Sequence, residues 1–321
     1  MQSFWTGLPK PFFALAPLDD VTDAAFRRLI ARYGRPDIMF TEFTSADGLV
    51  LAPEAGKQKL LKKLIFSEEE RPIVAQLFTS VPEHMEEASH LCAQLGFDGI
   101  DINMGCPDKA IEKGGCGAAL IKKPSLAREL IRAAKKSGLP VSVKTRIGYN
   151  KDELESWLPE LLAEEPAAVT IHARTRKEMS DVPARWDSVA RAVEIRNTMR
   201  SSTLIIGNGD VEDIVNARKK AEETKCDGVM LGRAIFGNPW IFSNSRELAH
   251  SPKERIGALQ EHLALFDELL SGTTSYATMK KHFKSYVSGW NGAKELRVRL
   301  METESSALAQ EILTEVVGNT K

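Results

Sequence analysis

Cysteines, long apolar runs and net charge are all scarce in this sequence, and each shortage excludes a class of protein. The four cysteines among 321 residues include no CxxC pair, which argues against a disulfide scaffold and against a structural zinc site. The N-terminal segment has no signal-peptide pattern, and no later apolar run is long enough to cross a bilayer. We therefore expect a cytoplasmic protein with reduced thiols and no membrane association.

Charge and composition are those of an ordinary globular protein. The 43 lysines and arginines nearly balance the 44 aspartates and glutamates, so any surface that binds a polyanion must be local. Apolar residues make up 43% of the chain and charged residues 27%, which excludes collagen-like and disordered classes. The length allows one large domain or one domain with an appendage.

Short apolar segments alternate with amphipathic helical segments from the start of the chain to about residue 240. Their continuous apolar character suits parallel strands that are covered on both faces. Eight consecutive strand-helix units predict an α/β fold of the (β/α)8 TIM-barrel class, and an open doubly wound sheet is the second interpretation. The predicted strands are 12–17, 37–43, 72–78, 98–104, 140–145, 167–173, 203–209 and 227–232.

Polar or ionisable residues stand where these predicted strands end. In (β/α)8 barrels the chemistry gathers at the C-terminal ends of the strands, and polar groups that end apolar strands are costly unless they are paired or functional. The sequence therefore predicts a functional site at this end of the barrel. The residues at the strand ends are Pro17, Glu42, Gln76, Asn103, Cys106, Lys144, His172, Asn208, Asp210, Gly232 and Arg233, and all but Pro17 and Gly232 have polar or ionisable side chains.

The pattern becomes purely helical after residue 242, so we predict a barrel domain at 1–242 and an all-helical domain at 243–321. Residues 280–299 of the second domain hold six lysines and arginines against Glu295 alone, a local excess of five positive charges. His282, Tyr286 and Trp290 are interleaved with these charges. Two interpretations are open: a solvated helix face, or a phosphate-contacting surface with stacking aromatics.

The segment 101–120, DINMGCPDKAIEKGGCGAAL, ends a predicted strand at Asn103 and then exposes Cys106 on a glycine turn. Here the sequence resembles the tRNA-dihydrouridine synthases, a family of flavin-dependent barrel enzymes. The simple bacterial type fits best, because no additional zinc or double-stranded-RNA module is present. The resemblance covers nearly the whole chain in order, through APLDDVTDAAFRRL (16–29), PVSVKTRIG (140–148), TIHARTR (170–176), IIGNGD (205–210), GVMLGRAIFGNPWIF (228–242) and MKKHFKSYVSG (279–289).

The resemblance implies that reduced FMN, recharged by NADPH, reduces the C5–C6 double bond of a uridine in tRNA to 5,6-dihydrouridine. A hydride would pass from flavin N5 to uracil C6, and a proton donor would then protonate C5. Cys106 aligns with the family's catalytic cysteine. Because a thiol with a reference pKa of ~8.5 is mostly protonated yet can release its proton, the expected role of Cys106 is general acid.

The resemblance also implies a set of cofactor-binding residues. The first loop, with Pro17, Leu18 and Asp19, would lie along the flavin ring through its backbone, although Leu18 and Asp19 depart from the family's usual methionine and small residues. Gln76 would bind the pyrimidine edge, Lys144 would lie near N1 and O2, and His172 near the flavin. The expected phosphate site follows the last two strands and comprises Asn208, Gly209, Asp210, Gly232 and Arg233.

Substrate contacts are expected from both domains. In the barrel, Asn103 and Arg174 would face the flavin or the uridine. The helical domain would contact tRNA phosphates through Lys280, Lys281, His282 and Lys284. Cys116 is expected to have a packing role, and the 176–186 loop departs from the sequence of relatives.

Two alternative functions stay open. One is an FMN-dependent TIM-barrel oxidoreductase acting on a free pyrimidine or enone, and the other is a non-catalytic tRNA-binding protein. A monomer without metal is the default expectation.

Overall fold

The computed structural model describes residues 3–243 and 250–319 of the chain. Each of the eight predicted strands is present, together with the short additional strand β3. The strands are β1 (Phe12–Leu15), β2 (Met39–Phe40), β3 (Thr44–Ser45), β4 (Ile73–Phe78), β5 (Gly99–Met104), β6 (Val141–Arg146), β7 (Ala168–His172), β8 (Leu204–Asn208) and β9 (Gly228–Leu231).

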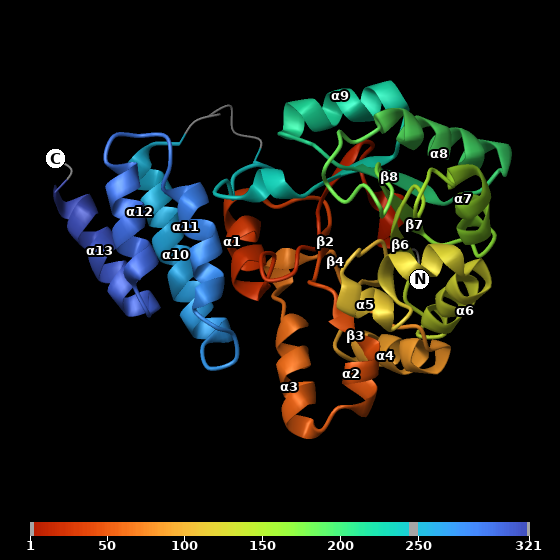
Figure 1. Cartoon of the computed structure of the whole chain (residues 1–321), viewed down its shortest axis with the longest axis horizontal. Helices are drawn as coiled ribbons and strands as arrows, with labels where there is room; N and C mark the ends of the chain where they lie inside the picture. The colour runs from red at the N-terminus through yellow and green to blue at the C-terminus, as the bar shows by residue number, and fades with distance from the viewer. Residues whose placement is uncertain (1–2, 244–249, 320–321) are drawn as a thin grey trace.

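These strands form a parallel barrel (Figure 1). The sheet follows the order β1-β9-β8-β7-β6-β5-β4-β2, and β3 pairs with β4. Between β1 and β2 the circle closes through a parallel bridge from Ala14 to Ile38, and the backbone N–H of Leu15 donates to the carbonyl of Ile38 at 3.1 Å. The predicted (β/α)8 TIM barrel is therefore confirmed.

Helices surround the barrel, and most of them bury one face against it. Pro124 occupies the first turn of α6, whose Leu130 and Ile131 are fully buried, as the apolar periodicity predicts. The helices of this part are α1 (Ala24–Gly34), α2 (Ala46–Leu51), α3 (Glu54–Lys63), α4 (Pro82–Gln94), α5 (Lys109–Lys113), α6 (Pro124–Lys135), α7 (Leu154–Leu162), α8 (Trp186–Thr198) and α9 (Ile214–Thr224).

Alternation along the strands divides the core into two layers. Phe12 and Ala14 belong to a cluster inside the barrel, whereas Phe13 and Leu15 pack outward among residues of the surrounding helices. Trp5 packs edge-on against Phe12, with 6.1 Å between ring centroids, and fills the end of the barrel where β1 begins. The opposite end is left for polar side chains.

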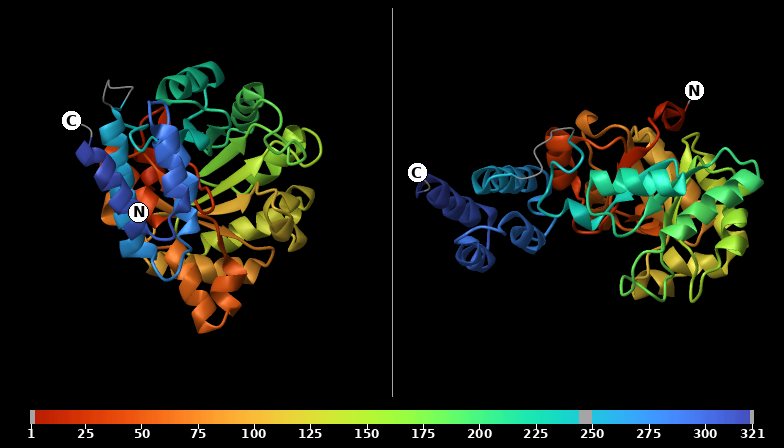
Figure 2. Two further views of the ribbon diagram at one scale, coloured as in Figure 1. Left: turned by 60° about the vertical axis from the view of Figure 1, so that its left-hand side comes forward. Right: turned by 90° about the horizontal axis from the view of Figure 1, so that it is seen from above.

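The C-terminal part is helical and packs on α1 (Figure 2). It consists of α10 (Pro252–Leu270), α11 (Ala277–Tyr286), α12 (Ala293–Glu302) and α13 (Ser306–Asn319). Phe26 of α1 stacks on His262 of α10, with 4.8 Å between ring centroids. The predicted domain boundary at 243 adjoins residues 244–249, which lie outside the described residues. Within 3–243 and 250–319, no helix combines the length and the apolar character needed to cross a bilayer.

Candidate active site

A cavity of about 740 Å³ opens at the C-terminal ends of the barrel strands. It lies where the strand-end residues of the sequence predict a functional site. Asp19 and the four predicted residues of the helical part do not line it. The predicted residues that do are Pro17, Leu18, Gln76, Asn103, Cys106, Lys144, His172, Arg174, Asn208, Gly209, Asp210, Gly232 and Arg233.

The turn that carries Cys106 is held from below by Asn103. The side-chain oxygen of Asn103 accepts hydrogen bonds from the backbone N–H groups of Gly105 at 3.1 Å and Cys106 at 2.9 Å. On the other side, the carbonyl of Cys106 accepts from the backbone of Ala118 at 2.9 Å. Gly117 has φ of 59°, and a Cβ at this position would lie 2.7 Å from the Cys106 carbonyl oxygen. A side chain at Gly117 would therefore displace the turn.

Burial raises the pKa of the Cys106 thiol above its ordinary value, although the nearby charges of Lys144 and Arg146 act in the opposite direction. The thiol is thus protonated at neutral pH. Desolvation, reinforced by Arg146, lowers the pKa of Lys144 to about 8. The pocket is therefore lined by a proton donor, the Cys106 thiol, and by a lysine, Lys144, that can lose its charge near neutral pH.

His172 is neutral in this site. Burial, together with the surrounding cationic side chains, lowers its pKa well below the ordinary value. Its Nε2 lies 3.3 Å from a guanidinium nitrogen of Arg174, which is a donor, so the neutral ring accepts this hydrogen bond. The cationic character of the site therefore comes from lysine and arginine, and it favours an anionic or electron-rich ligand.

The predicted phosphate end is also assembled. The carboxylate of Asp210 joins two arginines, at 2.5 Å from Arg174 and 2.9 Å from Arg233, and it accepts from the backbone of Ala184 at 2.8 Å. Gly209 has φ of 124°, and a Cβ there would lie 2.9 Å from that of Ala184. Asp210 therefore positions the cations, while the side chain of Arg233 remains 64% exposed.

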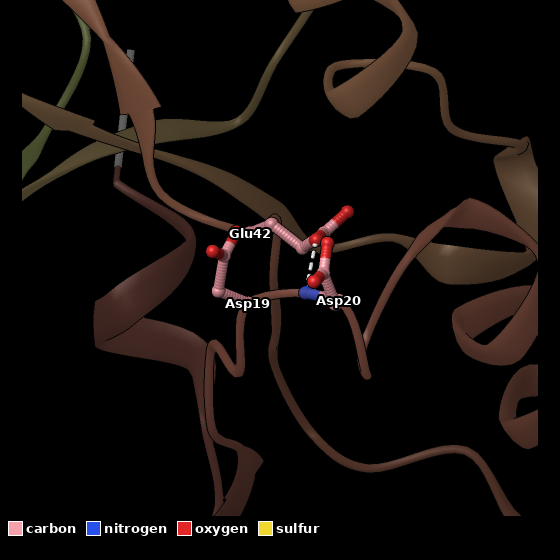
Figure 3. Close-up of side chains that lie close together, drawn as sticks. All are labelled: Asp19, Asp20 and Glu42. Carbon is pink, nitrogen blue, oxygen red and sulfur yellow. Dashed lines mark hydrogen bonds between the residues drawn. The ribbon is translucent and has the colours of Figure 1, made fainter. Parts of the chain in front are cut away.

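Asp19 does not line the cavity and belongs to an acidic cluster with Asp20 and Glu42 (Figure 3). Lys63 of α3 lies 2.5 Å from Asp19 and 3.8 Å from Glu42. Lys281 of α11 lies 2.9 Å from Asp20. Although three carboxylates could hold a cation, Asp19 and Asp20 are each paired with a lysine and Glu42 also lies near Lys63, so we assign no metal to them.

The structure corrects part of the interpretation of the helical segment. His282 and Tyr286 are fully buried, so neither can stack on or contact a nucleic acid at the surface. His282 packs against Phe26, at 4.8 Å between ring centroids. Lys280 donates to the carbonyl of Met301 at 2.8 Å, and Lys284 is exposed on the same helix. The lysines therefore form the outer side of α11, and His282 and Tyr286 belong to its inner side. The third predicted stacking residue, Trp290, follows α11 and is half-buried, with the guanidinium of Arg255 at 5.2 Å from its ring centroid.

Sequence reasoning missed Arg146 as a member of the site. Its Nε donates to the carbonyl of Gly105 at 2.9 Å, and one terminal nitrogen donates to the carbonyls of Thr175 at 3.0 Å and Met179 at 2.9 Å. It thereby ties the turn before Cys106 to the loop after β7. The signal was available, because a residue two positions after Lys144 on a strand shares its face.

The divergent 176–186 loop is tied to the segment after Cys106. Arg176 and Glu112 of α5 form a bidentate ion pair. Tyr149 lies below it, with the guanidinium of Arg176 at 5.3 Å and the ammonium of Lys122 at 3.9 Å from the ring centroid. Cys116 is buried beside this segment, and its thiol is free.

Comparison with known proteins gives a consistent result. The model of the dihydrouridine synthase (Dus) family matches residues 14–319. The probable tRNA-dihydrouridine synthase of Staphylococcus aureus (strain COL) is 43% identical over 317 residues, which cover 98% of this chain and 95% of that protein. The probable tRNA-dihydrouridine synthase 2 of Bacillus subtilis (strain 168) is 44% identical over 307 residues, 95% of this chain and 94% of that protein.

Solved structures with a similar fold are distant in sequence. The 2-naphthoyl-CoA reductase complex aligns with a TM-score of 0.53 and 13% identity, covering 72% of this chain and 49% of that one. Histamine dehydrogenase from Rhizobium sp. 4-9 aligns with a TM-score of 0.51 and 13% identity, covering 79% and 48%. These likenesses concern the barrel fold alone.

Proposed function

The chain belongs to the dihydrouridine synthase family, and we propose that it reduces the C5–C6 double bond of a uridine in tRNA to 5,6-dihydrouridine, with FMN as cofactor and NADPH as reductant. The observation that carries the proposal is the protonated thiol of Cys106 at the mouth of a cationic barrel pocket. The family match and the relatives' names support tRNA as the substrate. No feature of the pocket favours a free pyrimidine or enone instead.

The pocket residues fit FMN. Lys144 supplies a cation for the electron-rich pyrimidine edge, and Gln76 supplies an amide in the pocket lining. At the other end, Arg233 offers an exposed guanidinium beside the backbone of Gly209, where the lack of a side chain permits close approach of a phosphate. When bound, FMN would supply the hydride that reaches C6 of the uracil.

Cys106 supplies the proton that completes the reduction. Hydride addition at C6 leaves negative charge at C5, conjugated into the C4 carbonyl, and the thiol proton moves to C5. The thiolate that remains is stabilised by the positive charges of Lys144 and Arg146, which favour the ionised form. Asn103 fixes the position of the donor through two backbone hydrogen bonds. The thiol therefore acts as a general acid and forms no covalent bond.

The tRNA reaches this site across the helical part. A uridine inside a folded tRNA must leave its stack to enter the pocket, which costs a few kcal/mol. Lys280, Lys281 and Lys284 lie on the outer side of α11, and Lys281 contacts Asp20 in the loop that follows the pocket residue Leu18. Phosphate contacts made there would offset the cost of exposing the base.

The proposal is tested by replacing Cys106→Ala and, as a matched control in the same segment, Cys116→Ala. We expect the Cys106→Ala protein to bind FMN and oxidise NADPH normally but to form dihydrouridine about 10²–10⁴ times more slowly, which is the usual contribution of a general acid. Unmodified tRNA is the substrate, and mass spectrometry of its nucleosides is the readout. Equal dihydrouridine formation by the wild-type and Cys106→Ala proteins would refute the role of the thiol. Reduction of free uracil without tRNA would favour the small-molecule alternative.

A further inference from the structure

Asp101 is a fully buried carboxylate inside the barrel, directly below the pocket, and the reaction described above does not use it. On β5, Ile100 and Ile102 pack outward in the main core, so Asp101 and Asn103 point to the barrel interior. The parallel register pairs Asp101 with Gln76 on β4 and with Ser142 on β6. Three polar side chains therefore lie next to one another across three strands.

Both oxygens of Asp101 accept hydrogen bonds. Oδ2 accepts from the side-chain nitrogen of Gln76 at 2.7 Å, and Oδ1 accepts from the hydroxyl of Ser142 at 2.6 Å. Burial raises the pKa of Asp101 to about 6, and these two hydrogen bonds limit the rise. At neutral pH the group is therefore an ionised carboxylate, which can accept hydrogen bonds but cannot donate one.

A group that only accepts hydrogen bonds fixes the orientation of the amide that donates to it, and that amide in turn fixes the orientation of the next one. Because Asp101 requires the nitrogen of Gln76, the Gln76 oxygen must face Asn103, and it accepts from the Asn103 side-chain nitrogen at 3.1 Å. The oxygen of Asn103 is thereby directed to the backbone N–H groups of the turn that carries Cys106. With both amides reversed, the Gln76 oxygen would face the Asp101 carboxylate, acceptor against acceptor, and the Asn103 nitrogen would face the backbone N–H groups, donor against donor.

We propose that Asp101 is a positioning residue, which fixes the direction of the Gln76 and Asn103 amides and thereby prepares both the cofactor pocket and the Cys106 turn. In this arrangement Gln76 keeps one side-chain N–H without a partner among the described residues, and that N–H is left for an acceptor atom on the pyrimidine edge of FMN. The inference rests on the proposed function for the identity of the cofactor. The direction of the amides rests on the hydrogen bonds alone.

The test is Asp101→Asn, which keeps the shape of the side chain but offers Gln76 a donor as well as an acceptor. The matched control is Thr170→Val, because Thr170 is a buried residue on β7 whose hydroxyl has no hydrogen-bond partner in the described structure. FMN binding is measured by quenching of FMN fluorescence. The midpoint potential of the bound flavin is measured by anaerobic titration.

For Asp101→Asn we expect FMN binding about tenfold weaker than in the wild type. We also expect a more positive midpoint potential, because a buried negative charge near the reduced flavin has been removed. Thr170→Val is expected to match the wild type in both measurements. A midpoint potential and an FMN affinity equal to those of the wild type in Asp101→Asn would overturn the proposal.

Two further outcomes are informative. If Asp101→Asn does not fold, Gln76→Leu cuts the same chain of hydrogen bonds while leaving Asp101 in place. Gln76→Leu should then weaken FMN binding to a similar extent, and unchanged FMN binding would count against the proposed chain of hydrogen bonds.

If the wild-type protein itself binds no FMN, the proposed function fails. The role of Asp101 is then tested by the rate at which iodoacetamide alkylates Cys106. We expect this rate to differ between the wild type and either variant, and equal rates would overturn the proposed role of Asp101.

Discussion

The buried carboxylate of Asp23 provides a stability measurement that tests the described interface between barrel and helices. Asp23 caps α1, and its Oδ1 accepts from the backbone of Phe26 at 2.9 Å, whereas Oδ2 has no partner among the described residues. The residue is 4% exposed, at the end of α1 that packs on α10 and α11. Burial, together with the charge of Glu42, raises its pKa from 3.8 to about 7.

The sign of the effect follows from the direction of this shift. Because the folded state binds the proton more tightly than the unfolded state, the contribution of Asp23 to the free energy of unfolding is complete below pH 4 and is lost as the pH rises to 7. A difference of about 3 pKa units, at 1.36 kcal/mol each, corresponds to about 4 kcal/mol over the whole range. Between pH 5 and pH 8 the loss is about 2.5 kcal/mol, because part of it has already occurred at pH 5.

Asp23→Asn removes this pH dependence while an oxygen remains to cap α1. Urea unfolding at pH 5 and pH 8 should show the stability of Asp23→Asn, relative to the wild type, rising by about 2.5 kcal/mol at the higher pH. The same substitution at Asp213, an exposed N-cap of α9 that accepts from the backbone of Asn216 at 2.7 Å, controls for the change of capping group. If the wild-type and Asp23→Asn curves ran parallel between the two pH values, Asp23 could not be buried as described.

Two further predictions concern ligand binding. Replacing Lys281 and Lys284 together with Glu should weaken tRNA binding roughly tenfold in a filter-binding assay and leave FMN binding unchanged, because phosphate contacts dominate the affinity of such surfaces. Lys219→Glu, on the exposed side of α9, is the matched control, and equal tRNA affinity in all three proteins would exclude α11 from the interface. Lys144→Met should make the midpoint potential of bound FMN more negative, because it removes the positive charge that stabilises the reduced anion. A potential equal to that of the wild type would show that Lys144 lies too far from the flavin to act on it.

The barrel and most of the pocket were predictable from the sequence for one physical reason. Parallel strands covered on both faces appear as continuous apolar runs, and their C-terminal ends meet at one edge of the barrel. Asn103, Lys144 and His172 stand near the C-terminal ends of three different runs, far apart in the sequence, and the structure places all three in the same cavity. The position of a strand end thus predicts the position of its polar side chain.

The error at the helical segment has an equally definite cause. Counting charges along 280–299 treats the segment as one surface, whereas a helix divides it into sides. Met279, His282, Phe283 and Tyr286 recur at intervals of three and four and are all buried, while Lys280, Lys281 and Lys284 occupy the remaining positions. Helical periodicity, applied to MKKHFKSY, would have assigned the histidine to the inner side.

Other features depend on partners that no local pattern specifies. Asp19 pairs with Lys63 because α3 ends at Lys63, beside the loop that contains Asp19. Nothing near Asp19 in the sequence indicates where that helix lies. Asp101 is an intermediate case, since a carboxylate within an apolar strand requires hydrogen-bond donors in the folded protein. The sequence therefore indicates that donors exist, but only the register of three strands identifies Gln76 and Ser142 as those donors.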